Sequence, residues 1–355
     1  MGKIDWISNI RVFATTSIIL LHVTAYIVIE QFSTIPNVKW WTANIYDSIV
    51  RCSSPLFFMI TGALFLSKEI EIKLFLKKRF IRVIIPFLFW SFIYILFEVT
   101  MTSVYQQTNF FANFWNANFG ARLLKGEISY HFWYVYCIIG LYLFIPILNK
   151  WIRNSKDSEI LYFLAVWFIT LIISYRYLGE KIFWDLKPLY FSEYIGYLVL
   201  GYYLFKVNLS KLAGGRFAVL DNKIFFTLLI ILSFLVTAFG TYYFSIKEGT
   251  FSHIFYNRLS INVVFLAIGV FLLIKSCKPT NKVYIKTINF LYKYSYGIFL
   301  VHALILPQLS KLGINGYLIH PIIGIPITTL ACLGVSLLIV FLVNKIPIAG
   351  KYISG

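Results

Sequence analysis

Ten apolar stretches, each about 17 to 25 residues long, constrain this chain most, because each is long enough to cross a bilayer as an α-helix. Of its 355 residues, 59% are hydrophobic and only 13% are charged, and the mean hydropathy is +0.78. Soluble domains do not have this composition. We therefore predict an all-α membrane protein with about ten transmembrane helices bundled around a polar cavity. The stretches cover residues 8–30, 45–66, 80–104, 131–152, 159–177, 190–206, 222–244, 257–275, 288–309 and 319–344.

The lysines and arginines indicate how these helices are oriented. With the N-terminus in the cytoplasm, ten spans place 22 of the 32 basic residues on the cytoplasmic side, as the positive-inside rule requires. We expect both termini to be cytoplasmic and the protein to lie in the inner or plasma membrane. Topology explains the net charge of +18 better than a nucleic-acid partner, and we expect none. Residues 1–355 are expected to form a single polytopic membrane domain with no soluble domain.

Arg11 and His22 lie within the first apolar stretch, where an ionisable side chain costs about 2.5 to 3.5 kcal/mol. Eleven residues correspond to three helical turns plus about 20° and a rise of roughly 16 Å, so both side chains lie on one face. Thr15, Tyr26 and Glu30 fall within about 60° of the same direction. Separately, the arginine is explained as an interfacial anchor and the histidine as a packing residue. Together they predict one wall of a polar site, with both groups in a single lumen open to the cell interior.

A basic segment, KKRFIRVIIP at residues 77–86, precedes the third stretch. Arg79 and Arg82 are three residues apart and lie on one side of a helix, next to Lys78. Membrane topology alone explains these charges. The functional alternative is a phosphate site, because guanidinium groups bind phosphate bidentately whereas lysines act as point charges.

Polar residues in later stretches are further candidates. Asp47 and Arg51 are spaced for an i, i+4 ion pair that would offset its own desolvation and so has a purely structural explanation as well. The other candidates share a position at a helix start or in an apolar context: His131, Trp133, Ser295, Tyr296 and His302.

Taken in order, these segments resemble the acyltransferase-3 family of integral membrane acyltransferases, and within it the short, stand-alone members of the kind that O-acetylate the enterobacterial common antigen. An arginine, ten residues and a histidine on the first helix are matched by Arg11 and His22, and a basic RxxR by Arg79 and Arg82. The other matched runs are FFxxSG at residues 57–62, an H-x-W-aromatic stretch at 131–146 and SYGIYLxH at 295–302. Two positions depart from the pattern. Ser8 replaces an acid, leaving Asp5 as the candidate partner of Arg11, and Thr61 replaces the serine of FFxxSG.

The resemblance implies transfer of an acyl group, most often acetyl from cytoplasmic acetyl-CoA, to a hydroxyl of a cell-surface glycan or its lipid-linked precursor. It implies a catalytic pair, His22 and Arg11, with the histidine as general base or as nucleophile. Acetyl-CoA would be the co-substrate, held by Arg79, Arg82 and Lys78, and no metal is expected. The residues expected to bind or support the substrate are Arg51, Asp47, Tyr26, Glu30, His131, Trp133, Ser295, Tyr296 and His302. The expected partners are membrane lipid and the glycan acceptor, and homo-oligomerisation stays open.

Two other functions remain open at the level of sequence. The first is export of a glycan or small molecule without acyl chemistry, because exporters also carry ionisable residues near the midplane. The second is recognition of an amino acid or glycan by this membrane domain on behalf of a partner enzyme. The sequence has no hydropathy symmetry between its halves and no GxSxG, P-loop, HExxH or Rossmann motif. Its four cysteines form no CxxC pair, so neither a metal site nor a disulfide framework is expected.

Overall fold

Helices account for all regular structure in the part of the chain that the computed structural model describes, residues 5–30, 32, 37–174, 193–206 and 223–355. Eight helical stretches in this part are long and apolar enough to cross a membrane. The predicted class, an all-α membrane protein, is confirmed. The spans expected at 159–177 and 190–206 are not among the eight, and both run into residues 175–192, outside the described part. The count of ten and the cytoplasmic termini therefore stay predictions.

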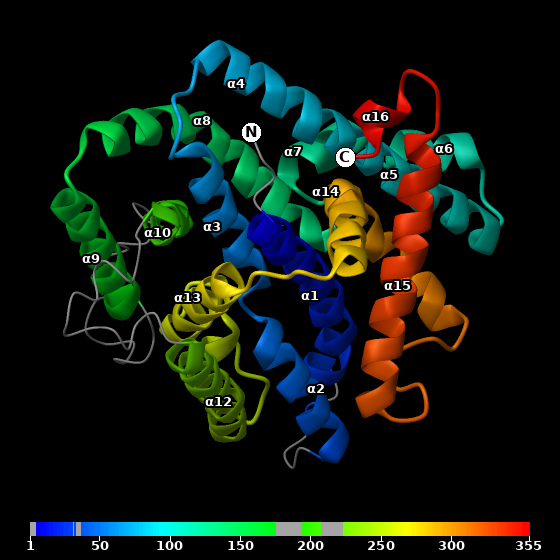
Figure 1. Cartoon of the computed structure of the whole chain (residues 1–355). Helices are drawn as coiled ribbons and strands as arrows, with labels where there is room; N and C mark the ends of the chain where they lie inside the picture. Colours follow the sequence, from blue (N-terminus) through cyan, green and yellow to red (C-terminus); the bar gives the residue numbers. More distant parts are fainter. Residues whose placement is uncertain (1–4, 31, 33–36, 175–192, 207–222) are drawn as a thin grey trace.

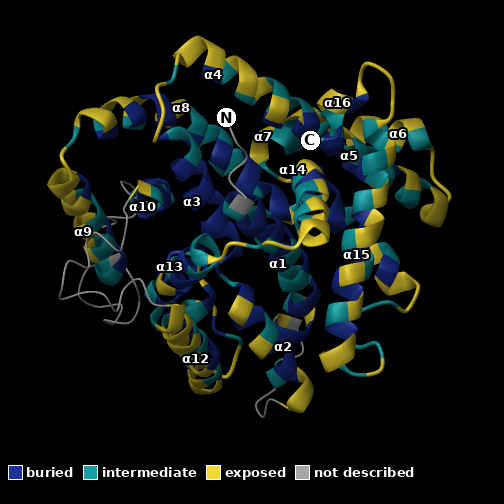
Figure 2. Cartoon of the chain, in the orientation of Figure 1, coloured by how far each residue is buried: buried dark blue, intermediate teal, exposed yellow. Residues whose placement is uncertain are grey.

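The helices surround a central pair, α1 (Asp5–Glu30) and α3 (Ser53–Phe65), as Figure 1 shows. Figure 2 shows that this pair is mostly buried, whereas the outward sides of α9 and α12 are exposed. The exposed residues of α12 include Leu228, Leu232 and Phe239, as expected for a helix that faces lipid. The other helices are α2 (Val38–Val50), α4 (Ile72–Arg79), α5 (Ile85–Gln106), α6 (Phe110–Asn116), α7 (Phe119–Lys125), α8 (Trp133–Asn154), α9 (Asp157–Ser174), α10 (Ile195–Lys206), α12 (Lys223–Glu248), α13 (Ile261–Ser276), α14 (Lys282–Lys311), α15 (Pro321–Asn344) and α16 (Gly350–Ile353).

The span expected at 45–66 is broken into two helices, α2 and α3, at Arg51 and Cys52. Pro55 explains the break, because proline has no N–H to donate to the carbonyl of Arg51 four residues earlier and its ring crowds that carbonyl. The break lies in the middle of the Val38–Phe65 stretch. It therefore puts the Arg51 side chain deep in the bundle rather than at a helix end near water.

A second proline accounts for an irregular turn between α4 and α5. Residues Phe80–Ile84 form a π-helical turn, η1, just before Pro86 at the start of α5. Because Pro86 cannot donate to the carbonyl of Arg82, the α-helical ladder is interrupted there and the turn widens. The hydroxyl of Tyr296, on α14, donates to the carbonyl of Val83 at 2.9 Å and so links this turn to the bundle.

The first helix, α1, and the late helix α14 run side by side in the same direction. The guanidinium carbon of Arg11 lies 5.2 Å from the ring centre of Tyr292, and the rings of His22 and His302 lie 5.3 Å apart. These contacts are separated by eleven residues on α1 and ten on α14, a rise of roughly 15 to 16 Å on each helix. Two polar segments that are almost 300 positions apart in sequence thus meet in register.

Two glycines allow α3 and α10 to pack at a short interhelical distance. A Cβ atom on Gly62 would overlap the backbone of Leu198, and one on Gly201 would overlap the backbone of Met59. Small residues let membrane helices pack at backbone contact, where dispersion forces are strongest. This packing fixes the face of α3 that carries Phe57 and Thr61.

We predict that Gly201→Ala destabilises the protein by about 1–3 kcal/mol, because the added methyl group must push two helix backbones apart. The control is Gly140→Ala on α8, where a Cβ has no atom within 4 Å. Thermal unfolding of the purified protein in detergent measures the difference. Equal melting temperatures for the two variants would show that α3 and α10 do not pack at backbone contact.

Candidate functional site

A cavity of about 970 Å³ lies at the end of the bundle that carries α4 and η1. Its lining comes from α1, α3, α4, η1, α5, α8, α14, α15 and the segment around α16. The cationic residues that line it are Arg11, Arg79, Arg82, Lys293 and Lys351. Among the described residues of the lining none has an acidic side chain, so the side chains make the cavity electrostatically suited to an anion.

The cavity changes in character from its opening to its deep end. At the opening, or rim, Arg82, Lys293 and Lys351 are exposed. The deep end is an aromatic floor formed by the buried rings of Phe57, Tyr134 and Phe299. Their ring centres are 5.4 to 6.4 Å apart, as in packed aromatic clusters. An elongated ligand with a charged end and an apolar end matches this gradient.

Aromatic rings hold the arginine that is deepest on the α4 side of the cavity. The guanidinium carbon of Arg79 lies 4.7 Å from the ring centre of Phe65, 5.7 Å from that of Phe75 and 5.8 Å from that of Tyr142. Rings attract a cation without using up its N–H groups. Within the described part of the chain, the buried Nε of Arg79 has no hydrogen-bond partner. The guanidinium group therefore keeps donors for a ligand.

Three histidines from three elements lie together beyond the aromatic floor: His22 on α1, His131 on η2 (Tyr130–Phe132) and His302 on α14. The His302 ring lies 5.3 Å from that of His22 and 4.9 Å from that of His131. Phe299 of the floor contacts this histidine cluster, at 5.4 Å from His131 and 5.7 Å from His302. Among the described residues, no group of three or more His, Cys, Asp or Glu residues has an arrangement that could hold a metal ion. Acid–base chemistry, which a histidine supplies alone, fits this cluster.

Hydrogen bonds occupy both ring nitrogens of His131. Its Nε2 lies 3.3 Å from the carbonyl oxygen of Leu300, which can only accept, so the proton is assigned to Nε2. Its Nδ1 lies 2.9 Å from the hydroxyl of Ser129 and accepts from it. His131 is thereby fixed as a neutral ring with no lone pair for a substrate.

His22 differs from its neighbours in having both nitrogens available. His302 donates from Nδ1 to the carbonyl of Phe299 at 2.6 Å, which leaves its buried Nε2 without a partner in the described part of the chain. For His22, no hydrogen bond joins either ring nitrogen to another described residue, and the ring contacts only Tyr130 and His302 among the described aromatics. Of the three histidines, His22 is the one best placed to take a proton from a bound hydroxyl.

Arg11 and His22 lie at two levels of α1. Arg11 lines the cavity and His22 is not part of its lining, whereas Phe299 of the lining contacts His302, whose ring stacks on that of His22. That Arg11 and His22 share one lumen stays a prediction. Asp5 was predicted to pair with Arg11, and Glu30 to support the substrate site. The side chains of both residues lie outside the described part of the chain.

The other predicted residues of the donor and substrate sites divide into two groups. Arg79, Arg82, Ser295 and Tyr296 line the cavity. Lys78 and Tyr26 do not. Lys78 is exposed on α4, and Tyr26 is 52% exposed and packs against Tyr317 instead.

Asp47 and Arg51 form the predicted ion pair, away from the cavity lining. Thr24 donates to the fully buried Asp47 Oδ2 at 2.9 Å, and the Arg51 guanidinium carbon lies 3.7 Å from the ring centre of Tyr256. A buried pair with these extra contacts is the arrangement that offsets desolvation. That the Asp47–Arg51 pair also contacts the substrate stays a prediction.

Sequence reasoning missed two residues. Lys293, a basic residue of the predicted cytoplasmic side, lines the rim of the cavity. Arg258 lies at the start of the span expected at 257–275, at the end that the predicted topology places outside the cytoplasm, where the positive-inside rule disfavours arginine; its guanidinium carbon lies 4.1 Å from the ring centre of Trp133. That unfavourable position was the signal that could have identified it.

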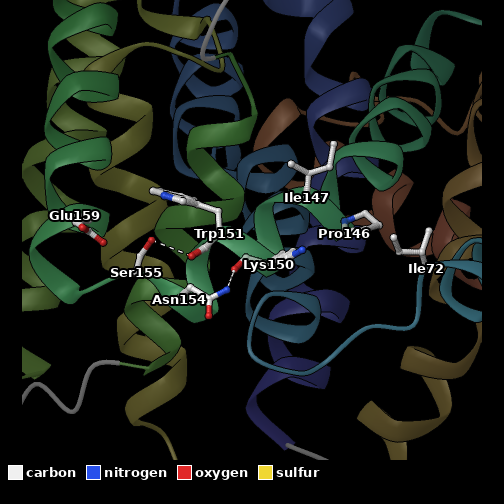
Figure 3. A pocket seen from close by; sticks show the side chains of 8 residues that line it. All are labelled: Ile72, Pro146, Ile147, Lys150, Trp151, Asn154, Ser155 and Glu159. Atoms are coloured by element: carbon white, nitrogen blue, oxygen red, sulfur yellow. Dashed lines mark hydrogen bonds between the residues drawn. The ribbon is translucent and has the colours of Figure 1, made fainter.

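A second hollow, of about 630 Å³, lies between α4 and α8 with Glu159 of α9 at its edge (Figure 3). Its polar groups are partly used within α8, since Ser155 donates to the carbonyl of Trp151 and Asn154 to that of Lys150. None of the residues predicted for the functional site lines it. We therefore assign the functional site to the larger cavity and the histidine cluster.

We predict that Asp47→Asn destabilises the protein by about 3–5 kcal/mol, because it leaves the Arg51 charge buried without its carboxylate. The double variant Asp47→Asn/Arg51→Gln should recover part of that loss, since no uncompensated charge remains. Thermal unfolding in detergent of the two single variants and the double variant gives the coupling. Additive losses would mean that the two charges do not stabilise each other.

A family model described as an acyltransferase domain matches residues 4–343, which is nearly the whole chain. Neither the search of curated proteins nor that of solved structures gave a significant match. A match of this extent decides the family, and the predicted resemblance is confirmed. The chain belongs to the acyltransferase-3 family and is a multi-pass membrane acyltransferase.

Proposed function

We propose that this protein transfers an acetyl group from cytoplasmic acetyl-CoA to a hydroxyl of a cell-surface glycan or its lipid-linked precursor. One observation carries the proposal. The cavity has arginines and lysines at and below its rim, an apolar aromatic floor, and a histidine cluster directly beyond that floor. Acetyl-CoA is polyanionic at one end and carries an uncharged thioester at the other, and this polarity matches the cavity.

The donor end of the site would use guanidinium groups. Arg79 and Arg82 bind phosphate oxygens bidentately, and Arg11 lies deeper, about 16 Å along α1 from His22. The pantetheine arm would extend from these phosphates toward the aromatic floor. The positive-inside rule supports entry of the donor from the cytoplasm, because α4 and η1 carry a dense group of basic residues.

His22 would act as the general base. It takes the proton of the acceptor hydroxyl, the hydroxyl oxygen attacks the thioester carbonyl, and the carbon–sulfur bond breaks to release CoA thiolate, which is then protonated. A variant has His22 attack first and carry the acetyl group as an acyl-histidine. In both forms the thioester has to pass Phe299, whose ring lies between the cavity and the histidine cluster.

We predict that Arg82→Gln weakens binding of CoA to the purified protein about tenfold or more, because it removes a charge-assisted hydrogen bond worth about 1.5–3 kcal/mol. Lys78→Gln is the matched control, since it removes a positive charge four residues away that does not line the cavity. Titration calorimetry of both variants in detergent gives the comparison. Equal affinities for the two variants would return Arg82 to a purely topological role.

We predict that His22→Ala lowers acetyl transfer by about 10²- to 10⁴-fold, the usual contribution of a general base. The readout is the acetyl mass on surface glycans of cells that express the variant, compared with wild type by mass spectrometry. His320→Asn is the control, because His320 caps α15 and asparagine keeps a capping group there. Full acetylation by His22→Ala would refute both forms of the mechanism, and labelled acetyl trapped on the wild-type protein would select the acyl-histidine form.

A further inference from the structure

Arg258 lies at the opposite end of the bundle from the cavity rim. It follows η6 (Ile254–Tyr256) and precedes α13. Phe271, near the end of α13, packs 5.3 Å from Trp6 at the start of α1, so α13 runs antiparallel to α1. Thirteen residues separate Arg258 from Phe271, a distance of about 20 Å along the helix direction. Arg258 therefore lies on the His22 side of the aromatic floor, away from the arginines proposed to bind CoA.

The local structure holds the Arg258 backbone and side chain in one position. Its carbonyl accepts a hydrogen bond from the hydroxyl of Tyr197, 2.5 Å away, and the next N–H donates to the Asn257 side chain at 3.0 Å. Its guanidinium group stacks on Trp133, with 4.1 Å between the guanidinium carbon and the ring centre. Stacking occupies a face of the planar group and leaves its N–H edges directed outward.

Among the described residues the Arg258 guanidinium forms no ion pair, and the Asp47 carboxylate within its electrostatic range is the one already paired with Arg51. The charges of both Arg258 and Arg51 lie within electrostatic range of the His22 ring. In the loop outside the membrane-spanning segments, burial and then the Arg51 charge lower the pKa of His253, which agrees with a positive local field. A cation largely withdrawn from water without a counter-ion is unfavourable unless a ligand supplies the negative charge.

We propose that Arg258, held on Trp133, binds an anionic group of the acceptor and so presents the acceptor hydroxyl to His22. This inference rests on the proposed function and adds the chemical class of the acceptor: an acidic glycan. Carboxylate and phosphate both present two oxygens to the edge of a guanidinium group, so a uronic acid and a sugar phosphate share the recognised chemistry. Trp133 begins α8 directly after η2, which carries His131, and the charge of Arg258 lies within electrostatic range of His22.

A purely structural role is the alternative, in which Arg258 only clamps η6 and α13 against α8. The two roles differ in what they require of a ligand. A clamp gains nothing from an added anion, whereas a binding site is stabilised by an anionic sugar by RT ln(1 + [L]/Kd), which grows with the concentration of the sugar.

The test compares three small sugars as ligands of the purified full-length protein in detergent: methyl glucuronide, glucose 1-phosphate and neutral methyl glucoside. We expect one or both anionic sugars to raise the melting temperature progressively as their concentration increases, and the neutral sugar to leave it unchanged. Glucuronide alone would identify a carboxylate acceptor, and glucose 1-phosphate alone a phosphate-linked one. Equal responses to all three sugars, or none, would overturn the proposal.

The variants Arg258→Gln and Arg258→Lys show whether Arg258 is responsible. We expect Arg258→Gln to raise the apparent dissociation constant of the anionic sugar, fitted from the melting-temperature shifts, at least tenfold, and Arg258→Lys to have a smaller effect because it keeps the charge but loses the bidentate edge. Arg153→Gln is the control, an exposed arginine that pairs with Glu69. An unchanged response in Arg258→Gln would overturn the proposal.

Stabilisation by CoA in the same samples shows that each variant is folded and keeps the donor cavity at the other end of the bundle. If the wild-type protein binds CoA but does not distinguish the three sugars, the proposed function stands and the proposed anion site at Arg258 is refuted. Failure to bind CoA would instead count against the proposed function. The two failures are therefore distinguishable.

Discussion

Cations placed inside an apolar bundle are the constraint on which this structure depends. In the described part of the chain, four arginines within the bundle have the guanidinium group over an aromatic ring: Arg11 over Tyr292, Arg51 over Tyr256, Arg79 over Phe65 and Arg258 over Trp133. Of these four, only Arg51 pairs with a carboxylate among the described residues. Ring contacts offset part of the desolvation while leaving N–H donors unused. An ion pair would have consumed those donors, so the aromatic partners leave the arginines able to bind anions.

The arginines lie in two groups on either side of the histidine cluster. Arg11 and Arg79 are in the cavity below the rim, and Arg51 and Arg258 lie on the far side of the aromatic floor, near His22. Under our proposals this division gives the donor and the acceptor separate anion sites. The floor then keeps the two substrates apart except at the thioester. Such a separation suits an enzyme whose donor is in the cytoplasm and whose acceptor is at the cell surface. Only the acyl group then crosses the membrane, and neither substrate has to cross it.

Two prolines create the local geometry that the site uses. Pro55 breaks a membrane span at Arg51 and lets the side chain reach Asp47 and Tyr256 inside the bundle. Pro86 interrupts the helix at η1, where Ile81, Arg82 and Val83 line the cavity. In both places an arginine occupies the turn whose carbonyl the proline leaves without a donor. Irregular backbone at membrane depth is tolerated where it is enclosed by protein or lines a cavity, and both turns meet that condition.

The sequence by itself determined the fold class, most of the membrane spans and the family, because apolar length, charge distribution and short ordered motifs are local properties. It also predicted the Asp47–Arg51 pair, since i, i+4 spacing on a helix is enough to bring two side chains together. Only the tertiary structure decided which polar residues meet. The in-register packing of α1 on α14 brings His22 to His302, and His302 in turn contacts Phe299 of the cavity that Arg11 lines. Lys78 and Arg79 are neighbours in sequence, yet one faces water and the other lies among three rings, because helix rotation and packing against α3 and α8 set the direction of each side chain.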